Sequence, residues 1–169
     1  EIQNDLSDIQ RLLNYDRTAR QPQLTLCSLQ PLLNELYTSF LPVLHAQHIA
    51  LYLHIASNLP AIRADLSLIR QALINLLKNA IQAIGDQPDG QIDILVYCNE
   101  TEEVLIEIKN NGPVIPPEIA EHIFIPFFTT KEGGSGIGLS ISRQIMRLSG
   151  GSLTLLPDHK ETKFILKFK

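Results

Sequence analysis

Apolar positions recur along this chain at two spacings, which predict helices in some segments and strands in others. Spacings of three and four residues are typical of one face of a helix. They occur after Ser28 up to Leu44, from Asp65 to Gly85, and over about residues 136–148. Short runs rich in β-branched residues, several of them alternating apolar and polar, indicate strands. The predicted strands cover residues 24–27, 49–55, 91–97, 103–109, 152–156 and 162–168, with a brief extended link at 61–64.

The mixed order of helices and strands predicts the fold class. It favours an α/β (α+β) two-layer sandwich, with one mixed β-sheet covered by helices on one face. Residues 1–21 carry a separate apolar stripe that ends before Pro22. We therefore expect two parts: residues 1–21 as the truncated end of a helical element, and residues 22–169 as one domain.

Composition and charge narrow the range of functions. Eighteen acidic and fourteen basic residues give a net charge of −4, which disfavours a nucleic-acid partner. No apolar run approaches the ~20 residues of a membrane-spanning helix. Cys27 and Cys98 are too few for a disulfide framework and are expected to be small packing residues on strands. This cysteine usage indicates a reducing, cytoplasmic compartment.

Amide side chains form a stripe on the predicted helix from Asp65 to Gly85. Gln71, Asn75, Asn79 and Gln82 follow one another at spacings of four, four and three. Asn75 and Asn79 lie one turn apart, so both can reach a common site. A solvated helix face is one interpretation. The other is a set of neutral oxygen ligands for a magnesium ion that bridges phosphates.

A glycine-rich segment precedes the last predicted helix. Residues 133–139 read Gly-Gly-Ser-Gly-Ile-Gly-Leu. Glycines let backbone amides approach an anion, and a helix N-terminus favours negative charge. A phosphate-binding turn is therefore favoured over a merely flexible loop, although no P-loop lysine follows.

A loop of residues 110–135 separates two predicted elements. Loops of this length in compact domains are usually functional, often as lids. Phe124 and Phe127 are expected to anchor it to the core, and Lys131 can meet a phosphate as a point charge.

Four ordered motifs, at residues 75–80, 110–113, 124–131 and 134–139, together resemble the ATP-binding domain of sensor histidine kinases. The resemblance implies the fold shared by these kinases, gyrase-type ATPases, mismatch-repair ATPases and heat-shock chaperones. Residues 1–21 resemble the end of the second helix of the dimerisation domain.

The resemblance also implies roles for individual residues in binding ATP and Mg²⁺. Asn79 matches the magnesium ligand, and Asn75, Asn79 and Lys131 form the implied catalytic set. Asn110 matches the aspartate that accepts a hydrogen bond from the adenine amine. The implied nucleotide contacts are Asn75, Asn79, Asn110, Gly112, Ile115, Thr130, Lys131, Gly134, Ser135, Gly136, Ile137, Gly138, Leu139 and Thr162.

Several positions depart from the family pattern. The carbonyl of Asn110 can still accept a bond from adenine, at roughly half the strength of a charged acceptor. Its amide can also donate to a carbonyl, which would loosen adenine selectivity. Val114 and Glu161 stand where glycines are common. Asn75 is not such a departure but separates the branches of the superfamily. The gyrase-type and chaperone ATPases have a glutamate base at this position, and an amide cannot take up a proton near neutral pH.

These observations favour phosphoryl transfer to histidine over ATP hydrolysis. None of the five histidines matches a phosphoacceptor setting, so the expected acceptor lies on a dimerisation domain outside this chain. The resemblance implies a response regulator as a further partner and a homodimeric parent protein, whose membrane attachment is left open. The alternative is a degenerate nucleotide-binding or docking module without kinase activity. A third hypothesis, a gyrase-type ATPase, is disfavoured by Asn75.

Overall fold

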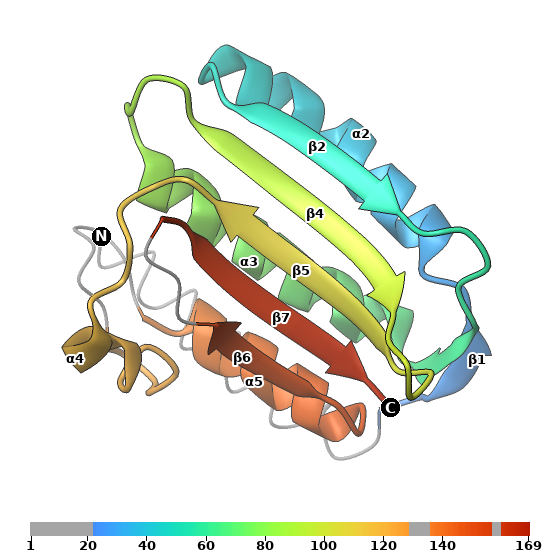
Figure 1. Ribbon diagram of the computed structural model, residues 1–169. Helices are drawn as coiled ribbons and strands as arrows, with labels where there is room; N and C mark the ends of the chain where they lie inside the picture. Colours follow the sequence, from blue (N-terminus) through green and yellow to red (C-terminus); the bar gives the residue numbers. More distant parts are fainter. Residues whose placement is uncertain (1–21, 129–135, 157–159) are drawn as a thin grey trace.

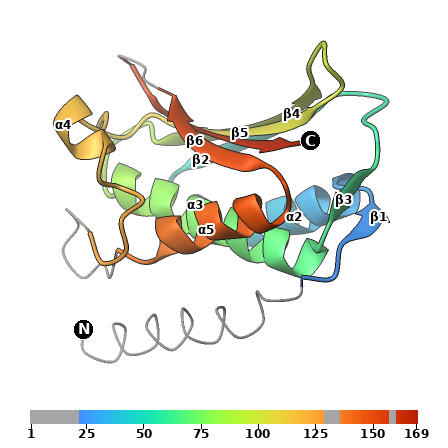
Figure 2. The same cartoon turned by 90° about the horizontal axis from the view of Figure 1, so that it is seen from below.

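A mixed β-sheet with helices on one face forms the body of the molecule. The computed structural model describes residues 22–128, 136–156 and 160–169. Helices α2 (Gln30–Ala46), α3 (Leu66–Ile84) and α5 (Gly138–Leu148) lie together on one side of the sheet (Figure 2). The short helix α4 (Pro117–Ala120) lies near one end of the sheet (Figure 1). The predicted two-layer α/β sandwich is confirmed.

The main sheet has five strands in the order β2-β4-β5-β7-β6. Strands β2 and β4 are parallel and every other pair in this sheet is antiparallel. The register sets Ile92 beside Asn110, and Asn110 beside Thr162. The end of β5 and the start of β7 therefore meet at one end of the sheet. The strand bounds are β2 (Ala50–Ile55), β4 (Gln91–Cys98), β5 (Val104–Asn110), β6 (Ser152–Leu156) and β7 (Thr162–Phe168).

A second, two-stranded sheet lies apart from the main one. Strands β1 (Thr25–Cys27) and β3 (Ile62–Ala64) pair antiparallel with each other. The sequence analysis expected a single sheet, and these two short segments are the exception. Asp65 directly follows β3 and is the N-cap of α3, so β3 ends after three residues.

The core lies between the sheet and the helices. Alternate residues of β4, β5 and β7 are buried, as their apolar spacing predicts, with β5 contacting α3 and β7 contacting α5. On the core face of α3, Leu66 is only partly buried, whereas the residues that follow it on that face are buried: Ile69, Leu73, Leu76, Leu77, Ala80 and Ile84. The buried strand residues are Ile92, Ile94, Val96, Val104, Ile106, Ile108, Phe164, Leu166 and Phe168.

Local signals set the limits of α3 as predicted. The Asp65 carboxylate accepts a hydrogen bond from the Ser67 backbone N–H at 3.1 Å, which is an N-cap. Gly85 ends the helix with a φ of +55°. Helix α2 starts differently, because Leu29 precedes it and no side chain caps it. Pro31 near its start supplies the fixed φ that suits a first turn.

The two cysteines differ in their surroundings. Cys27 is half-buried on β1, and its Sγ lies 3.5 Å from the carbonyl oxygen of Ile62. Burial raises the pKa of the Cys27 thiol. Cys98 is exposed, so its prediction as a packing residue is wrong. It is the last residue of β4, where the chain turns toward β5.

Within the described ranges, no helix combines the length and apolar character of a membrane span.

Candidate functional site

Segments distant in the sequence meet at the end of the sheet where β5 finishes. Asn75, in the middle of α3, donates from Nδ2 to the carbonyl of Gly138, the first residue of α5, at 3.4 Å. The Thr162 hydroxyl, at the start of β7, donates to the carbonyl of Pro113 at 3.4 Å. The structure thus brings together the asparagine pair, the end of β5 and the start of α5, and the described part of the fourth motif reaches the turn into α5 through the Phe127 N–H.

The amide stripe of α3 is not one uniform face. Asn75 is 8% exposed and lies between α3 and α5, so the solvated-face interpretation is wrong for it. Asn79, one turn later, is half-buried, whereas Gln82 is exposed. Asn75, at the interface of α3 and α5, is therefore held in place. Asn79 is only half-buried, so its side chain is partly accessible.

The end of β5 forms a tight backbone turn around Asn110. Its side-chain Oδ1 accepts the backbone N–H of Gly112 at 2.9 Å, and the residue is only 2% exposed. A Cβ at Gly112 would lie 2.9 Å from both the Ala83 carbonyl oxygen and Asn110 Oδ1. A side chain at position 112 would therefore clash with the end of α3 and with the Asn110 side chain. Ile115 follows half-buried against the core.

The turn into α5 also requires glycine. Gly136 has a φ of +76°, and a Cβ there would lie 2.3 Å from the Phe128 carbonyl oxygen. Its own carbonyl accepts the Phe127 N–H at 3.0 Å. Ile137 is fully buried and α5 then begins without a side-chain cap. The first amides of α5 are suited to an anion, because they lack a capping side chain.

The beginning of the predicted lid is anchored by one of the two expected aromatics. The Phe124 ring packs edge-on to Phe164 at 6.2 Å, and the Arg143 guanidinium lies 4.5 Å from its centroid. Phe127 is 55% exposed, so its prediction as an anchor is wrong. Its φ of +69° turns the chain, and Phe128 packs on the core instead.

Other predicted contacts lie outside the described residues or on their borders. Thr130, Lys131, Gly134 and Ser135 belong to the segment 129–135, which the structure does not describe. Leu139 is half-buried on the first turn of α5. Glu161, which replaces a common glycine, forms an ion pair with Lys109 at 3.8 Å.

Sequence reasoning missed two polar residues that hold the site together. The Asn111 side chain accepts from the Gln91 N–H at 2.7 Å and donates to the Asp89 carbonyl at 2.8 Å. The buried Ser142 hydroxyl donates to the Gly138 carbonyl at 2.9 Å. The Asn111 bonds span 20 and 22 positions, so no local pattern predicts them. The Ser142 bond lies within one turn of α5 and depends on that helix alone.

The donor set of the described residues suits a metal that binds together with a polyanion. No cluster of three or more histidine, cysteine, aspartate or glutamate side chains is found among them. The accessible amide of Asn79 is a neutral oxygen donor, and Mg²⁺ is commonly held by few protein ligands together with substrate phosphates. The side-chain oxygen of Asn79 is therefore chemically compatible with such an ion.

Comparison with known proteins identifies the family of the chain. The sequence profile described as "Histidine kinase-, DNA gyrase B-, and HSP90-like ATPase" matches residues 64–169. The C4-dicarboxylate transport sensor protein DctS of Rhodobacter capsulatus is 35% identical over 136 residues, 80% of this chain. The match covers 21% of DctS, so the chain corresponds to about a fifth of that relative.

Solved structures agree with the sequence relatives. The nucleotide-free catalytic domain of histidine kinase ThkA is 36% identical with a TM-score of 0.77, and the match covers 86% of this chain and 95% of that domain. ThkA in complex with the response regulator protein TrrA is 32% identical with a TM-score of 0.81. That match covers 99% of this chain and 48% of the ThkA chain.

Proposed function

The chain belongs to the histidine kinase-, DNA gyrase B- and HSP90-like ATPase family and has the fold of histidine kinase catalytic domains. From this premise we propose that it binds Mg-ATP and donates the γ-phosphoryl group to a histidine. The acceptor histidine lies on a dimerisation domain of the parent protein, to which we assign residues 1–21. The parent acts as a homodimer.

The buried side chain of Asn75 supports histidine as the acceptor. In the related ATPases a glutamate at this position removes a proton from the attacking group. Asn75 cannot do so, and its amide is engaged with the Gly138 carbonyl. A neutral imidazole nitrogen carries a lone pair and attacks phosphorus without a base. The new N–P bond forms as the bond to the ADP oxygen breaks, and the imidazole then loses its proton to water.

The residues of the site act by binding and orientation. Asn79 would hold the magnesium ion, whose charge offsets that of the phosphates. The first amides of α5 would receive phosphate oxygens, and Lys131 would add a positive charge. Gly112 would let the turn after β5 pack closely on the end of α3 beside the base, because there is no room for a side chain next to the Ala83 carbonyl. Such positioning accounts for most of the catalysis in phosphoryl transfer.

The complex of ThkA with TrrA supports a response regulator as the second partner. We propose that the parent protein passes its phosphoryl group from the histidine to an aspartate of such a regulator. The cytoplasm is the proposed location of this domain, because both ATP and response regulators are found there.

Replacing Asn79 tests the magnesium assignment. In Asn79→Ala, we expect calorimetric titration with a non-hydrolysable ATP analogue to show affinity about 10–100-fold lower in magnesium, the range seen when metal sites lose supporting groups. In a chelator the wild type and the variant should bind alike, because the ion is then removed from both.

The matched control for this substitution is Gln82→Ala. It removes an exposed amide three residues further along the same helix and should leave affinity unchanged. Circular dichroism checks that both variants fold. Unchanged magnesium-dependent affinity in folded Asn79→Ala would rule out the assignment.

A second experiment separates kinase from ATPase. The isolated chain should release almost no phosphate from Mg-ATP, because it has no base at position 75. The parent protein should acquire acid-labile phosphate on histidine. Steady hydrolysis by the isolated chain would instead favour an ATPase of the gyrase type.

A further inference from the structure

The inference concerns the base-reading residue, Asn110, and it rests on the proposed nucleotide-binding function. Asn110 ends β5 between Ile92 of β4 and Thr162 of β7. It is 2% exposed, and few polar side chains among the described residues are buried as deeply. An amide so far from solvent needs protein or ligand partners for both of its ends.

The orientation of this amide is set by the backbone. Oδ1 accepts the N–H of Gly112 at 2.9 Å. Since a backbone N–H can only donate, the side-chain atom that faces it must be the oxygen. Gly112 cannot move toward the end of α3, because even a Cβ there would lie only 2.9 Å from the Ala83 carbonyl oxygen. Rotating the amide by half a turn would set two donors against each other and leave the Gly112 N–H unpaired.

The other end of the amide, Nδ2, is therefore the group that remains for a ligand. Nδ2 donates no hydrogen bond to the residues that the structure describes. Leaving such a buried donor unpaired is unfavourable, so a ligand that accepts from Nδ2 is favoured. An aspartate at this position would present a second acceptor oxygen here, whereas asparagine presents a donor.

We propose that this donor makes the pocket accept purines that carry a carbonyl at position 6 at least as readily as adenine. Adenine offers an amine at that position, which is itself a donor and opposes Nδ2. Guanine and hypoxanthine offer an oxygen, which accepts from Nδ2. GTP and ITP are thus alternative phosphoryl donors for this domain, and ATP binds without a direct bond from its amine to Asn110.

The test compares nucleotides that differ at position 6. The isolated chain is titrated calorimetrically with ATP, ITP and GTP in the presence of Mg²⁺. ITP is the cleanest probe, because unlike GTP it adds no amino group at position 2. We expect ITP to bind as tightly as ATP or more tightly. This comparison within the wild type does not depend on the folding of any variant.

The substitution Asn110→Asp supplies the second arm. Its carboxylate can accept from both the Gly112 N–H and the adenine amine. It should shift the ratio of ATP to ITP affinity toward ATP by about tenfold, in line with one good base contact. Asn34→Asp is the matched control, because it adds the same charge at an exposed position of α2 and should not shift the ratio.

Each outcome has one meaning. Tighter binding of ATP than ITP by the wild type would overturn the inference and leave the proposed function standing. An unchanged ratio in Asn110→Asp would also overturn it, since position 110 would then not contact the base edge. Failure of a folded wild-type sample to bind any of the three nucleotides would overturn the proposed function itself.

Discussion

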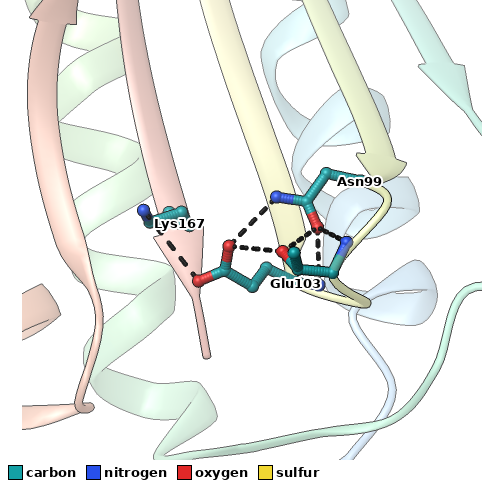
Figure 3. A network of polar contacts seen from close by, with 4 residues as sticks. Asn99, Glu103 and Lys167 are labelled. Carbon is teal, nitrogen blue, oxygen red and sulfur yellow. Dashed lines mark hydrogen bonds and ion pairs between the residues drawn. The ribbon is translucent and has the colours of Figure 1, made fainter.

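At the scale of single residues, asparagine side chains hold several backbone segments in place. Figure 3 shows this for the turn between β4 and β5, at the opposite end of β5 from the site. Asn99 Oδ1 accepts the backbone N–H groups of Thr101 and Glu103, at 3.1 and 2.8 Å. The Glu103 carboxylate accepts from Asn99 Nδ2 at 3.0 Å and lies 3.9 Å from Lys167 Nζ. Hydrogen bonds from Asn99 and Thr101 lower the pKa of Glu103.

A neighbouring pair on the open face of the sheet predicts a pH effect. The Tyr97 hydroxyl donates to the Glu107 carboxylate. Burial, with this hydrogen bond and the nearby negative charge, raises the pKa of Tyr97 to about 12. The neutral phenol is thus favoured in the folded state. Its contribution to stability is complete below about pH 10, the ordinary tyrosine pKa, and is lost as the pH rises through about 12.

Ultraviolet titration measures this directly. The difference in tyrosinate absorbance between the wild type and Tyr97→Phe should rise with a midpoint near pH 12. A midpoint near about 10 would show that Tyr97 is not held by Glu107.

At the scale of elements, the junction of α5 and β6 depends on two adjacent glycines with different roles. Gly150 has a φ of +78°, and a Cβ there would meet no atom of the described residues within 4 Å. A Cβ at Gly151 would lie 2.0 Å from the Lys167 carbonyl oxygen of β7. Gly150 is therefore required for its positive φ, and Gly151 is required because β7 passes too close for a side chain.

Alanine at each position separates these roles. Gly150→Ala should lower the free energy of unfolding by about 1 kcal/mol, because only the backbone conformation is strained. Gly151→Ala should cost about 3 kcal/mol or more, because two backbone segments must separate. Urea denaturation monitored by circular dichroism compares them, and equal costs would contradict the close approach of β7.

At the scale of the whole molecule, the two faces of the sheet are stabilised differently. One face packs on α2, α3 and α5 (Figure 2). On the other face, Lys109 pairs with Glu161 and Lys163 lies 4.0 Å from Glu107. Such partly exposed pairs contribute little, at most about 1 kcal/mol each. The buried face therefore carries most of the stability.

Phe164→Ala tests whether the buried face of the sheet carries most of the stability. Phe164 is 1% exposed and meets Phe124 edge-on. Its loss should cost about 3–5 kcal/mol, a large part of the roughly 5–15 kcal/mol of a typical domain. Tyr52→Ala, at an exposed position of β2, should change the free energy of unfolding by less than about 0.5 kcal/mol. Similar costs for the two variants, measured by urea denaturation, would contradict this picture of the core.

Much of the fold could be predicted from local pattern. The helix from Asp65 to Gly85 has a capping carboxylate, a terminal glycine and a regular apolar face, and all three were confirmed. The last two predicted strands, 152–156 and 162–168, were confirmed with the same bounds. Cys98 and Phe127 were predicted wrongly, because an apolar residue type says nothing about whether the chain turns away from the core at that point.

By itself, the sequence determined the elements, the family motifs and the amide at position 75, since these depend on residues close together along the chain. Only the tertiary structure decided how they act. The contact of Asn75 with Gly138 spans 63 positions, and the close approach of Gly112 to Ala83 joins a strand end to a helix end. The orientation of Asn110 follows from that approach, because a donor held in place by packing dictates which end of an amide can face it.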